Sequence, residues 1–585
     1  MRTHTPLEPV NGGEFVAEAL GAHGVSAVFT LCGGHISPIL VAAKRRGMRV
    51  VDVRDEASAV FAADAVARLT GTPGVAVVTA GPGATNTITA VTNASLAESP
   101  VVLIGGAPPT ILRGRGALQD IDHQALFRPH VKHAVRVERV RDLAAAVGQA
   151  FAVARRGTPG PTYVECAADL LYGESDVRRL YGVAGERTAT TLSARIERWV
   201  LERHLARLFA PGDASPEPGL SMEAPAAPER LVQRVTHALR VAQRPVLILG
   251  SQAVRLVSAI PQLVGAVERL GVPVYVNGTA RGLLPPGHPL LYRHRRTAAL
   301  KQADLVILAG VPLDFRLDYG RQIGRGTRIV AVSLGATAIR RNRRPAHGAV
   351  CEPARFVIAL AHHVSDGASR TTAWCDALRS RDNERDREIT AFAARPTEGV
   401  NPVALCRAID RALPDDSIIV ADGGDFVGTA AYTVSPRRPL SWLDPGPFGT
   451  LGAGGGFALG AAVARPGAEV WILYGDGAAA FSIAEFDTFV RHGLSVIAVV
   501  GNDGSWAQIA RGQQEMLGDD VATVLRRTAY DQVAEGYGGV GFELSDPTCM
   551  EAVLADARAA ARDGKPVLVN ALIGPSEFRA GSIAL

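Results

Sequence analysis

Short apolar runs rich in β-branched residues alternate with helical segments along nearly the whole chain. Within the first 180 residues, the runs SAVFTL, RVVDV, GVAVVTA and PVVLIGG are separated by segments with helical periodicity. Strands that alternate with helices indicate βαβ units, and continuous apolar runs are typical of parallel strands covered on both faces. We therefore predict an α/β protein built from doubly wound parallel sheets.

The chain is long enough for about three such units. Its 585 residues exceed what one hydrophobic core supports. A second series of strand-like runs begins at RPVLILG and a third at SIIVADGG. The stretch before the second series joins an arginine-rich helical segment to a run of Pro, Ala and Gly, as in a linker. We interpret that helix as a packed or solvated connecting element, with a membrane-surface helix as the alternative. The predicted parts are a first domain at 1–183, a helical linker at 184–228, a middle domain at 229–370 and a third domain at 371–585.

Composition excludes several classes of protein. Apolar residues make up 47% of the chain and charged residues 20%, which is typical of a globular protein. The net charge of +5 comes without a polybasic run, so we expect no nucleic-acid binding. Because the sequence has neither a long uncharged apolar stretch nor a signal-peptide pattern, we expect a cytoplasmic protein without a membrane partner. The six cysteines are scattered without metal-site spacing, and we expect reduced core residues.

Two strand-like runs of the third series end in turns that contain oxygen ligands. EVWILY is followed by Gly475, Asp476 and Gly477, and SVIAVV leads to Asn502 and Gly504. The carboxyl ends of parallel strands meet at one edge of a sheet, and Mg²⁺ prefers oxygen ligands while leaving positions for phosphate. The Asp476 carboxylate, the Asn502 amide oxygen and the Gly504 carbonyl would form half of such a shell. A Gly-Asp-Gly turn alone is common, so the prediction depends on its combination with Asn502 at the end of the next strand.

A Gly-Asp-Gly turn followed after about 25 residues by an asparagine resembles the signature of thiamine-diphosphate-dependent enzymes. The similarity extends over almost the whole chain and is to the acetolactate synthase, benzaldehyde lyase and oxalyl-CoA decarboxylase superfamily. It implies thiamine diphosphate and Mg²⁺ as cofactors and three doubly wound domains: pyrimidine-binding, middle Rossmann-like and diphosphate-binding. The family usually has two consecutive asparagines, whereas Gly501 precedes Asn502 here; the second asparagine is the family's metal ligand.

The segment ADGGDFVG contains several small residues, so its backbone N–H groups can approach an anion at a helix start. The later segment GPFGTLGAGGG resembles the one that shapes the cofactor in the same family. By resemblance, Gly424, Asp425 and Phe426 flank the diphosphate. The Gly449 carbonyl would accept from the cofactor's amino group, and Leu451 would force the cofactor into a V shape. An ordinary turn and a core leucine are the alternatives. The other residues that the resemblance assigns to the diphosphate and metal are Gly475, Asp476, Gly477, Ala478, Asn502, Gly504, Ser505 and Trp506.

The pyrimidine half of the cofactor is assigned to the first domain. Thiamine chemistry requires loss of the proton on the reactive carbon, and a carboxylate on the pyrimidine ring assists it. Glu56, in RDEASAVFAADAVAR, stands where the family keeps this glutamate; a surface group at a helix start is the alternative. Gly81, Gly83 and Asn86 would lie beside the pyrimidine. In the family the two halves come from different subunits, which implies a homodimer or homotetramer with active sites at the subunit interface.

Two polar residues indicate which reaction of the family this chain catalyses. LCGGHISPIL places His35 just after a strand, as in benzaldehyde lyase, where a histidine here moves protons on and off the substrate hydroxyl. Gln119 matches the family's active-site glutamine. We predict that His35 and Gln119 act as the acid/base and polarising pair, since cleaving a 2-hydroxyacyl bond requires deprotonation of its hydroxyl. A polar residue at a helix start is the alternative for His35. A turn residue is the alternative for Gln119 and for His123, which has no family precedent.

The resemblance is strongest to the acetolactate-synthase-like 2-hydroxyacyl-CoA lyases, which implies cleavage of a 2-hydroxyacyl-CoA to an aldehyde and formyl-CoA, or the reverse condensation. Acetolactate synthase is the main alternative, because Gln119 and Lys132 also match it. Leu118 and Arg511 depart from its pattern. A cofactor-binding homologue without turnover is an alternative of another class, although Glu56 is intact.

The middle domain could hold an ADP or CoA moiety, and FAD is less favoured. A solvated basic surface is the alternative. The arginines that would face phosphates are Arg293, Arg295, Arg296, Arg316 and Arg321.

Overall fold

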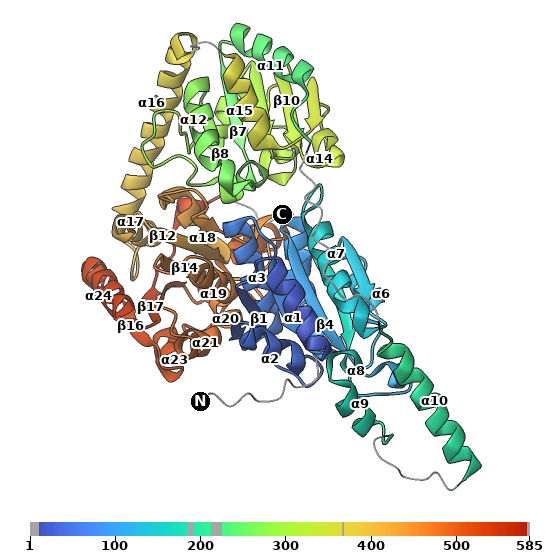
Figure 1. Ribbon diagram of the computed structural model, residues 1–585. Helices are drawn as coiled ribbons and strands as arrows, with labels where there is room; N and C mark the ends of the chain where they lie inside the picture. The colour runs from blue at the N-terminus through green and yellow to red at the C-terminus, as the bar shows by residue number, and fades with distance from the viewer. Residues whose placement is uncertain (1–10, 184–190, 212–224, 365–367, 582–585) are drawn as a thin grey trace, which may run out of the picture. The chain divides into compact units, whose positions relative to one another are not determined.

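The computed structural model describes residues 11–183, 191–211, 225–364 and 368–581 (Figure 1). These residues form three parallel sheets flanked by helices, which confirms the predicted α/β fold with three doubly wound domains. By compactness the chain divides into a first unit, residues 1–67 with 72–222, and a second unit, residues 68–71 with 223–585. The first sheet belongs to the first unit, and the other two sheets belong to the second. Parts of the predicted linker lie outside the described residues, so the domain boundaries stay predictions.

The sheet of the first unit has six parallel strands in the order β2-β1-β3-β4-β6-β5. Strands β3, β4 and β6 are buried along their whole length, as expected for strands covered by helices on both faces. The strands are β1 (Ala27–Thr30), β2 (Arg49–Asp52), β3 (Gly74–Val78), β4 (Val101–Ala107), β5 (His133–Arg136) and β6 (Thr162–Ala167). The helices are α1 (Gly12–Ala22), α2 (Ser37–Arg45), α3 (Glu56–Thr70), α4 (Pro82–Thr85), α5 (Ile88–Leu96), α6 (His123–Phe127), α7 (Leu143–Arg155), α8 (Ala168–Leu171), α9 (Glu174–Leu180) and α10 (Leu192–Leu208).

The middle sheet has five parallel strands in the order β11-β10-β9-β7-β8. Helix α12 ends at Leu270, directly before Gly271, whose left-handed conformation caps the last turn. The strands are β7 (Pro245–Leu249), β8 (Val274–Val276), β9 (Leu305–Ala309), β10 (Arg328–Ser333) and β11 (His347–Val350). The helices are α11 (Glu229–Val241), α12 (Ile260–Leu270), α13 (Arg296–Gln302), α14 (Ala336–Arg340) and α15 (Pro353–His363).

The third sheet has six parallel strands in the order β13-β12-β14-β15-β17-β16. Its central strands β12, β14 and β15 end in the turns that the sequence singled out. The strands are β12 (Ser417–Asp422), β13 (Trp442–Leu443), β14 (Glu469–Gly475), β15 (Val496–Asn502), β16 (Val540–Leu544) and β17 (Val567–Leu572). The helices are α17 (Pro402–Ala412), α18 (Gly424–Thr433), α19 (Gly454–Ala464), α20 (Asp476–Ser482), α21 (Glu485–Arg491), α22 (Ala507–Leu517), α23 (Tyr530–Gly536) and α24 (Met550–Arg562), and a 3-10 turn, η9 (Glu577–Arg579), follows β17.

One long helix, α16 (Ala368–Ala393), connects the two sheets of the second unit (Figure 1). Near its start, Trp374 and Leu378 pack into the core of the middle sheet. Near its end, Ile389 packs with Val403 and Phe578 beside the third sheet. The helix therefore contributes to both cores and fixes one to the other.

The cysteines only partly follow the sequence expectation. Cys166, Cys351 and Cys406 are buried free thiols, but Cys32 and Cys549 are exposed. The prediction of a core position is therefore wrong for Cys32 and Cys549. Within the part of the chain that the structure describes, no helix is both long and apolar enough to cross a bilayer.

Candidate functional site

The predicted proton-handling glutamate lies in the first unit beside two of its predicted neighbours. Glu56 is the first residue of α3 and is 6% exposed. Its Oε2 accepts a hydrogen bond from Nδ2 of Asn86 at 3.0 Å, and a Cβ atom on Gly83 would lie 3.4 Å from Oε1. The fold therefore brings Glu56, Gly83 and Asn86 together around a buried carboxylate.

Gly81 and Gln119 form a close backbone contact in the same unit. Both have positive φ, 59° for Gly81 and 64° for Gln119, and a Cβ atom on Gly81 would lie 2.7 Å from Cβ of Gln119. Glycine is therefore required at position 81. The Gly81 N–H donates to Nε2 of His123 at 3.0 Å, and burial lowers the pKa of His123, which keeps the ring able to accept. Sequence reasoning assigned no role to His123, because only this long-range contact identifies it.

His35 lies half-buried between β1 and α2, after the carboxyl end of a central strand. Its Nδ1 is 3.1 Å from Oγ1 of Thr79, which follows β3. Burial lowers the pKa of His35, so its ring is neutral at pH 7 and can take up a proton. The described residues show no hydrogen bond between His35 and either Glu56 or Gln119. A Cβ atom on Gly83 would nevertheless lie 2.7 Å from Cγ2 of Thr79 and 3.4 Å from Oε1 of Glu56.

The predicted metal ligands converge at the carboxyl ends of β14 and β15, where Gly475 is paired with Gly501. The Asp476 carboxylate accepts the N–H groups of Gly477 at 2.8 Å and Gly504 at 2.9 Å. Nδ2 of Asn502 donates to the Thr528 carbonyl and to Oδ1 of Asn570. Oδ1 of Asn502 is buried without a hydrogen-bond partner among the described residues. A buried oxygen without a donor fits a cation better than it fits an empty space.

Charge at this edge of the sheet also favours a cation. Burial raises the pKa of Asp476. Burial and the nearby Asp476 charge raise the pKa of Asp503 to about 7. The Gly504 carbonyl accepts from the Leu525 N–H at 2.7 Å, which leaves it one further lone pair. The described residues contain no cluster of three or more His, Cys, Asp or Glu side chains at metal spacing. This site does not form such a cluster, because it combines one carboxylate with amide and carbonyl oxygens.

The start of α18 offers a cradle for an anion next to the metal ligands. Gly423 precedes the helix with φ of 103°, and a Cβ atom there would overlap Ala478, which follows Asp476. A Cβ atom on Gly424 would meet nothing within 4 Å. The unpaired N–H groups of the first helical turn therefore border open space, as a diphosphate site requires.

Comparisons with known proteins agree with this geometry. Models of the thiamine pyrophosphate enzymes match residues 10–126 (N-terminal TPP binding domain), 232–360 (central domain) and 422–571 (C-terminal TPP binding domain). Proteins named 2-hydroxyacyl-CoA lyase 2 from Danio rerio and Homo sapiens are each 48% identical, over 99% and 98% of this chain and 94% and 92% of their own lengths. The chain belongs to the thiamine pyrophosphate enzymes. The large subunit of acetolactate synthase from Mycobacterium tuberculosis is 33% identical over 98% of both chains.

The loop expected to shape thiamine diphosphate is held by a buried carboxylate that sequence reasoning missed. Asp422, at the end of β12, accepts the N–H groups of Gly452 at 3.2 Å and Gly454 at 2.7 Å. Leu451 and Gly449, which has left-handed backbone, stand directly before these contacts. Asp422 therefore fixes the backbone that carries both predicted cofactor contacts.

Asp422 makes the stability of this loop depend on pH. Its side chain is fully buried, and burial raises its pKa from 3.8 to about 7. The folded protein then binds more protons than the unfolded chain between these values, so the stabilisation from this group is complete below about pH 4 and is lost as the pH rises through about 7. We expect Asp422→Asn to remove this slope, a change on the order of 4 kcal/mol across the window. Thermal unfolding midpoints of both proteins from pH 4 to 8 would test it, and parallel curves would contradict it.

The departure of this chain from the double asparagine has a packing cause. The ring of Phe426, on α18, occupies the place where a Cβ atom on Gly501 would lie. Asparagine at 501 and phenylalanine at 426 therefore exclude each other in this backbone.

Trp506 similarly occupies the space beside Gly477, and Ser505 donates its hydroxyl to the Thr523 carbonyl.

We expect Gly501→Asn to destabilise the protein by about 1–3 kcal/mol through overpacking in a central strand. The same substitution in a Phe426→Ala background should cost less, because the ring is gone. Gly493→Asn is a matched control, since a Cβ atom there meets nothing and asparagine tolerates its φ of 60°. Equal cost of Gly501→Asn in both backgrounds would show that Phe426 is not the cause.

Asp425 pairs with basic groups in addition to lying beside the cradle. Arg511, on α22, contacts both Asp425 oxygens, at 2.5 and 3.3 Å, and Nε of Arg579 lies 3.9 Å from Oδ1. Asp425 thus links α18 to α22 and to η9. The sequence pointed to Asp425 and Arg511 separately but not to their ion pair.

A cavity of about 900 Å³ lies in the second unit, between the middle and third sheets. Seven basic side chains line it and, among the described residues, no acidic one does: Arg281, Arg293, Arg295, Arg296, Lys301, Arg385 and Arg579. Burial, together with the charges of Arg293 and Arg296, lowers the pKa of Arg281 to about 10. Basic side chains therefore predominate in the lining, while Glu388, which pairs with Arg295 and Arg385, is not part of it.

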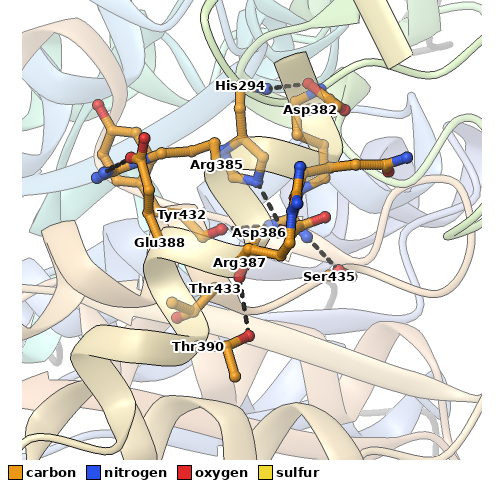
Figure 2. Close-up of polar contacts among 12 residues, drawn as sticks. His294, Asp382, Arg385, Asp386, Arg387, Glu388, Thr390, Tyr432, Thr433 and Ser435 are labelled. Carbon is orange, nitrogen blue, oxygen red and sulfur yellow. Dashed lines mark hydrogen bonds and ion pairs between the residues drawn. The ribbon is translucent and has the colours of Figure 1, made fainter. Parts of the chain in front are cut away.

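Several residues that line this cavity have a buried polar atom without a hydrogen-bond partner among the described residues. Figure 2 shows His294 beside α16, with Nε2 3.2 Å from Oδ1 of Asp386. His294 Nδ1, Nε of Arg296 and Nδ2 of Asn277 have no hydrogen-bond partner among the described residues. Of the arginines predicted to face phosphates, Arg316 and Arg321 pair with Asp314 and Asp318 and do not line the cavity. The other three line it, and one of them, Arg295, pairs with Glu388.

Proposed function

We propose that the chain cleaves 2-hydroxyacyl-CoA reversibly to an aldehyde and formyl-CoA, with thiamine diphosphate and Mg²⁺. The observation that supports this most strongly is the similarity, along nearly the whole chain, to proteins named 2-hydroxyacyl-CoA lyase 2. When bound, thiamine diphosphate would supply a nucleophilic carbon for cleavage of the carbon–carbon bond. Asp476, Asn502 and the Gly504 carbonyl would hold Mg²⁺, and the start of α18 would hold the diphosphate.

The residues of the chain handle the protons. Glu56 would hold a proton at the far nitrogen of the pyrimidine ring, because its buried carboxylate is kept in place by Asn86. Nε2 of His35 would take the proton of the substrate hydroxyl, which the neutral ring can accept. The Gln119 amide would donate to the substrate oxygen.

The basic cavity would bind the nucleotide end of CoA. Its size and its seven basic side chains suit a phosphorylated adenosine. The rings of Tyr275, Tyr292, Tyr432 and Phe578 also line it and would stack with the adenine. Arg579 lines the cavity and lies beside Asp425, so the cavity borders the start of the diphosphate helix. FAD stays a less favoured occupant.

We expect Lys301→Met to raise KM for the CoA thioester roughly 5- to 10-fold, because one exposed charge–phosphate contact is worth about 1 kcal/mol. KM for the matching pantetheine thioester, which lacks the nucleotide, should not change. Lys565→Met is the control, since Lys565 is exposed away from the cavity. An equal rise in KM for both thioesters would place the nucleotide elsewhere.

Acetolactate synthesis from pyruvate is the second candidate, supported by relatives at 33% identity. Lys132, which matches that enzyme in sequence, donates to the carbonyls of Val153 and Arg156 at the end of α7, a structural role. Parallel assays with formyl-CoA plus an aldehyde and with pyruvate separate the candidates. Acetolactate alone would remove the CoA proposal, and no product from either, with cofactor bound, would favour a homologue without turnover.

We also infer a homodimer or homotetramer in the cytoplasm. The pyrimidine residues lie in the first unit and the diphosphate residues in the second, and in the family such halves meet across a subunit interface. Analytical ultracentrifugation of the purified protein tests the assembly, and a monomer with full activity would contradict it.

A further inference from the structure

The side chain of Thr79 holds the ring of His35. Thr79 follows β3 and His35 follows β1, and these strands are neighbours in the sheet. Oγ1 of Thr79 lies 3.1 Å from Nδ1 of His35, with both side chains half-buried. Nδ1 is thus paired, and Nε2 is the ring nitrogen left for a substrate.

Both members of this pair occupy space that neighbouring glycines leave open. A Cβ atom on Gly33 would overlap the side chain of Thr79, and one on Gly83 would lie 2.7 Å from its Cγ2. A Cβ atom on Gly106 would lie 2.7 Å from Cβ of His35. Three glycines therefore make room for the pair, because a Cβ atom at any of them would collide with one of its members.

A neutral imidazole carries its proton on one nitrogen only, and the partner of that nitrogen selects it. The threonine hydroxyl can accept from Nδ1–H. When it does so, the lone pair stands on Nε2, where a hydroxyl proton can be taken up.

We propose that Thr79 is a positioning residue that accepts from Nδ1–H of His35 and so fixes the tautomer and orientation in which Nε2 is the base. The proposal rests on the proposed function, in which His35 takes the substrate hydroxyl proton. In other enzymes a carboxylate beside a catalytic histidine accepts from the ring N–H and fixes the tautomer, and the proposal assigns this role to Thr79.

The test compares Thr79→Val, which keeps the shape but removes the hydroxyl, with Thr79→Ser, which keeps the hydroxyl. We expect Thr79→Val to lower kcat roughly 10- to 100-fold, the range for partners that orient a functional histidine, and Thr79→Ser to stay within a few-fold. The KM for substrate and the affinity for thiamine diphosphate should change little in either. Thr92→Val is a matched control, because Oγ1 of Thr92 lies 2.9 Å from Nδ1 of His130 outside the site.

A second readout separates tautomer control from packing. In ¹⁵N-histidine spectra, with the His35 signals assigned by their loss in His35→Gln, the wild-type protein should show Nδ1 protonated. Thr79→Val should shift the proton to Nε2, and Thr79→Ser should restore the wild-type pattern. An unchanged tautomer in Thr79→Val, or an equal loss of kcat in Thr79→Ser, would overturn the proposal. Failure of the proposed function appears differently, as absence of cleavage by the wild-type protein, and leaves the spectral outcome to decide on Thr79.

Discussion

Glu56→Gln should lower kcat roughly 10²- to 10⁴-fold, the contribution of a positioned acid/base group. Glutamine has nearly the same shape and can keep the contact with Asn86, but it cannot exchange a proton with the pyrimidine ring. We therefore expect the loss in kcat, with the protein still folded and the cofactor still bound. Steady-state kinetics and titration with thiamine diphosphate measure the two parts separately.

The matched control for this substitution is Glu174→Gln. Glu174 also begins a helix, α9, but it is surface-exposed and pairs with Arg178. Its loss should leave kcat within about twofold, because exposed ion pairs contribute little. A Glu56→Gln protein with wild-type kcat would remove Glu56 from the chemistry, whatever the control shows.

Asp476→Asn should have the second large effect. It removes the carboxylate from a site whose other oxygens are neutral, so we expect the affinity for Mg²⁺ and thiamine diphosphate to fall by more than about 100-fold, with cleavage lost at ordinary magnesium concentrations. Calorimetric titration measures the affinity. Asp556→Asn, on the exposed face of α24, is the control, and unchanged cofactor affinity in Asp476→Asn would contradict the site.

The two inactive proteins also test the assembly. If each active site combines Glu56 of one subunit with Asp476 of another, mixed subunits of Glu56→Gln and Asp476→Asn contain some sites with both residues intact. Co-expression should then restore a fraction of the cleavage activity. No recovery from verified mixed assemblies would place both residues of a site in one chain.

The central strands could be predicted from the sequence because they are buried on both faces. β7, β9, β14 and β15 each appear as a continuous apolar run. The edge strands β5, β11, β13 and β16 were not predicted. In β5, β11 and β16, which are partly exposed, histidine, arginine, glycine or glutamate interrupts the apolar residues. β13 has only two residues. None of the four therefore gives a clear strand pattern.

The candidate site divides in the same way. Glu56, Asp476 and Asn502 follow recognisable segments, and their positions at strand and helix ends follow from the fold. His123 and Asp422 act through backbone groups 42 and 32 residues away, and no local pattern encodes such partners. The cavity also depends on segments as distant as Arg281 and Arg579, so only the folded chain shows that their charges gather.

The most direct test of the central claim is cleavage of a chemically defined 2-hydroxyacyl-CoA by the purified protein. Aldehyde and formyl-CoA should appear in equal amounts, only with thiamine diphosphate and Mg²⁺ present, and not with Glu56→Gln. Unchanged substrate in the presence of both bound cofactors, together with acetolactate formed from pyruvate by the same preparation, would contradict it.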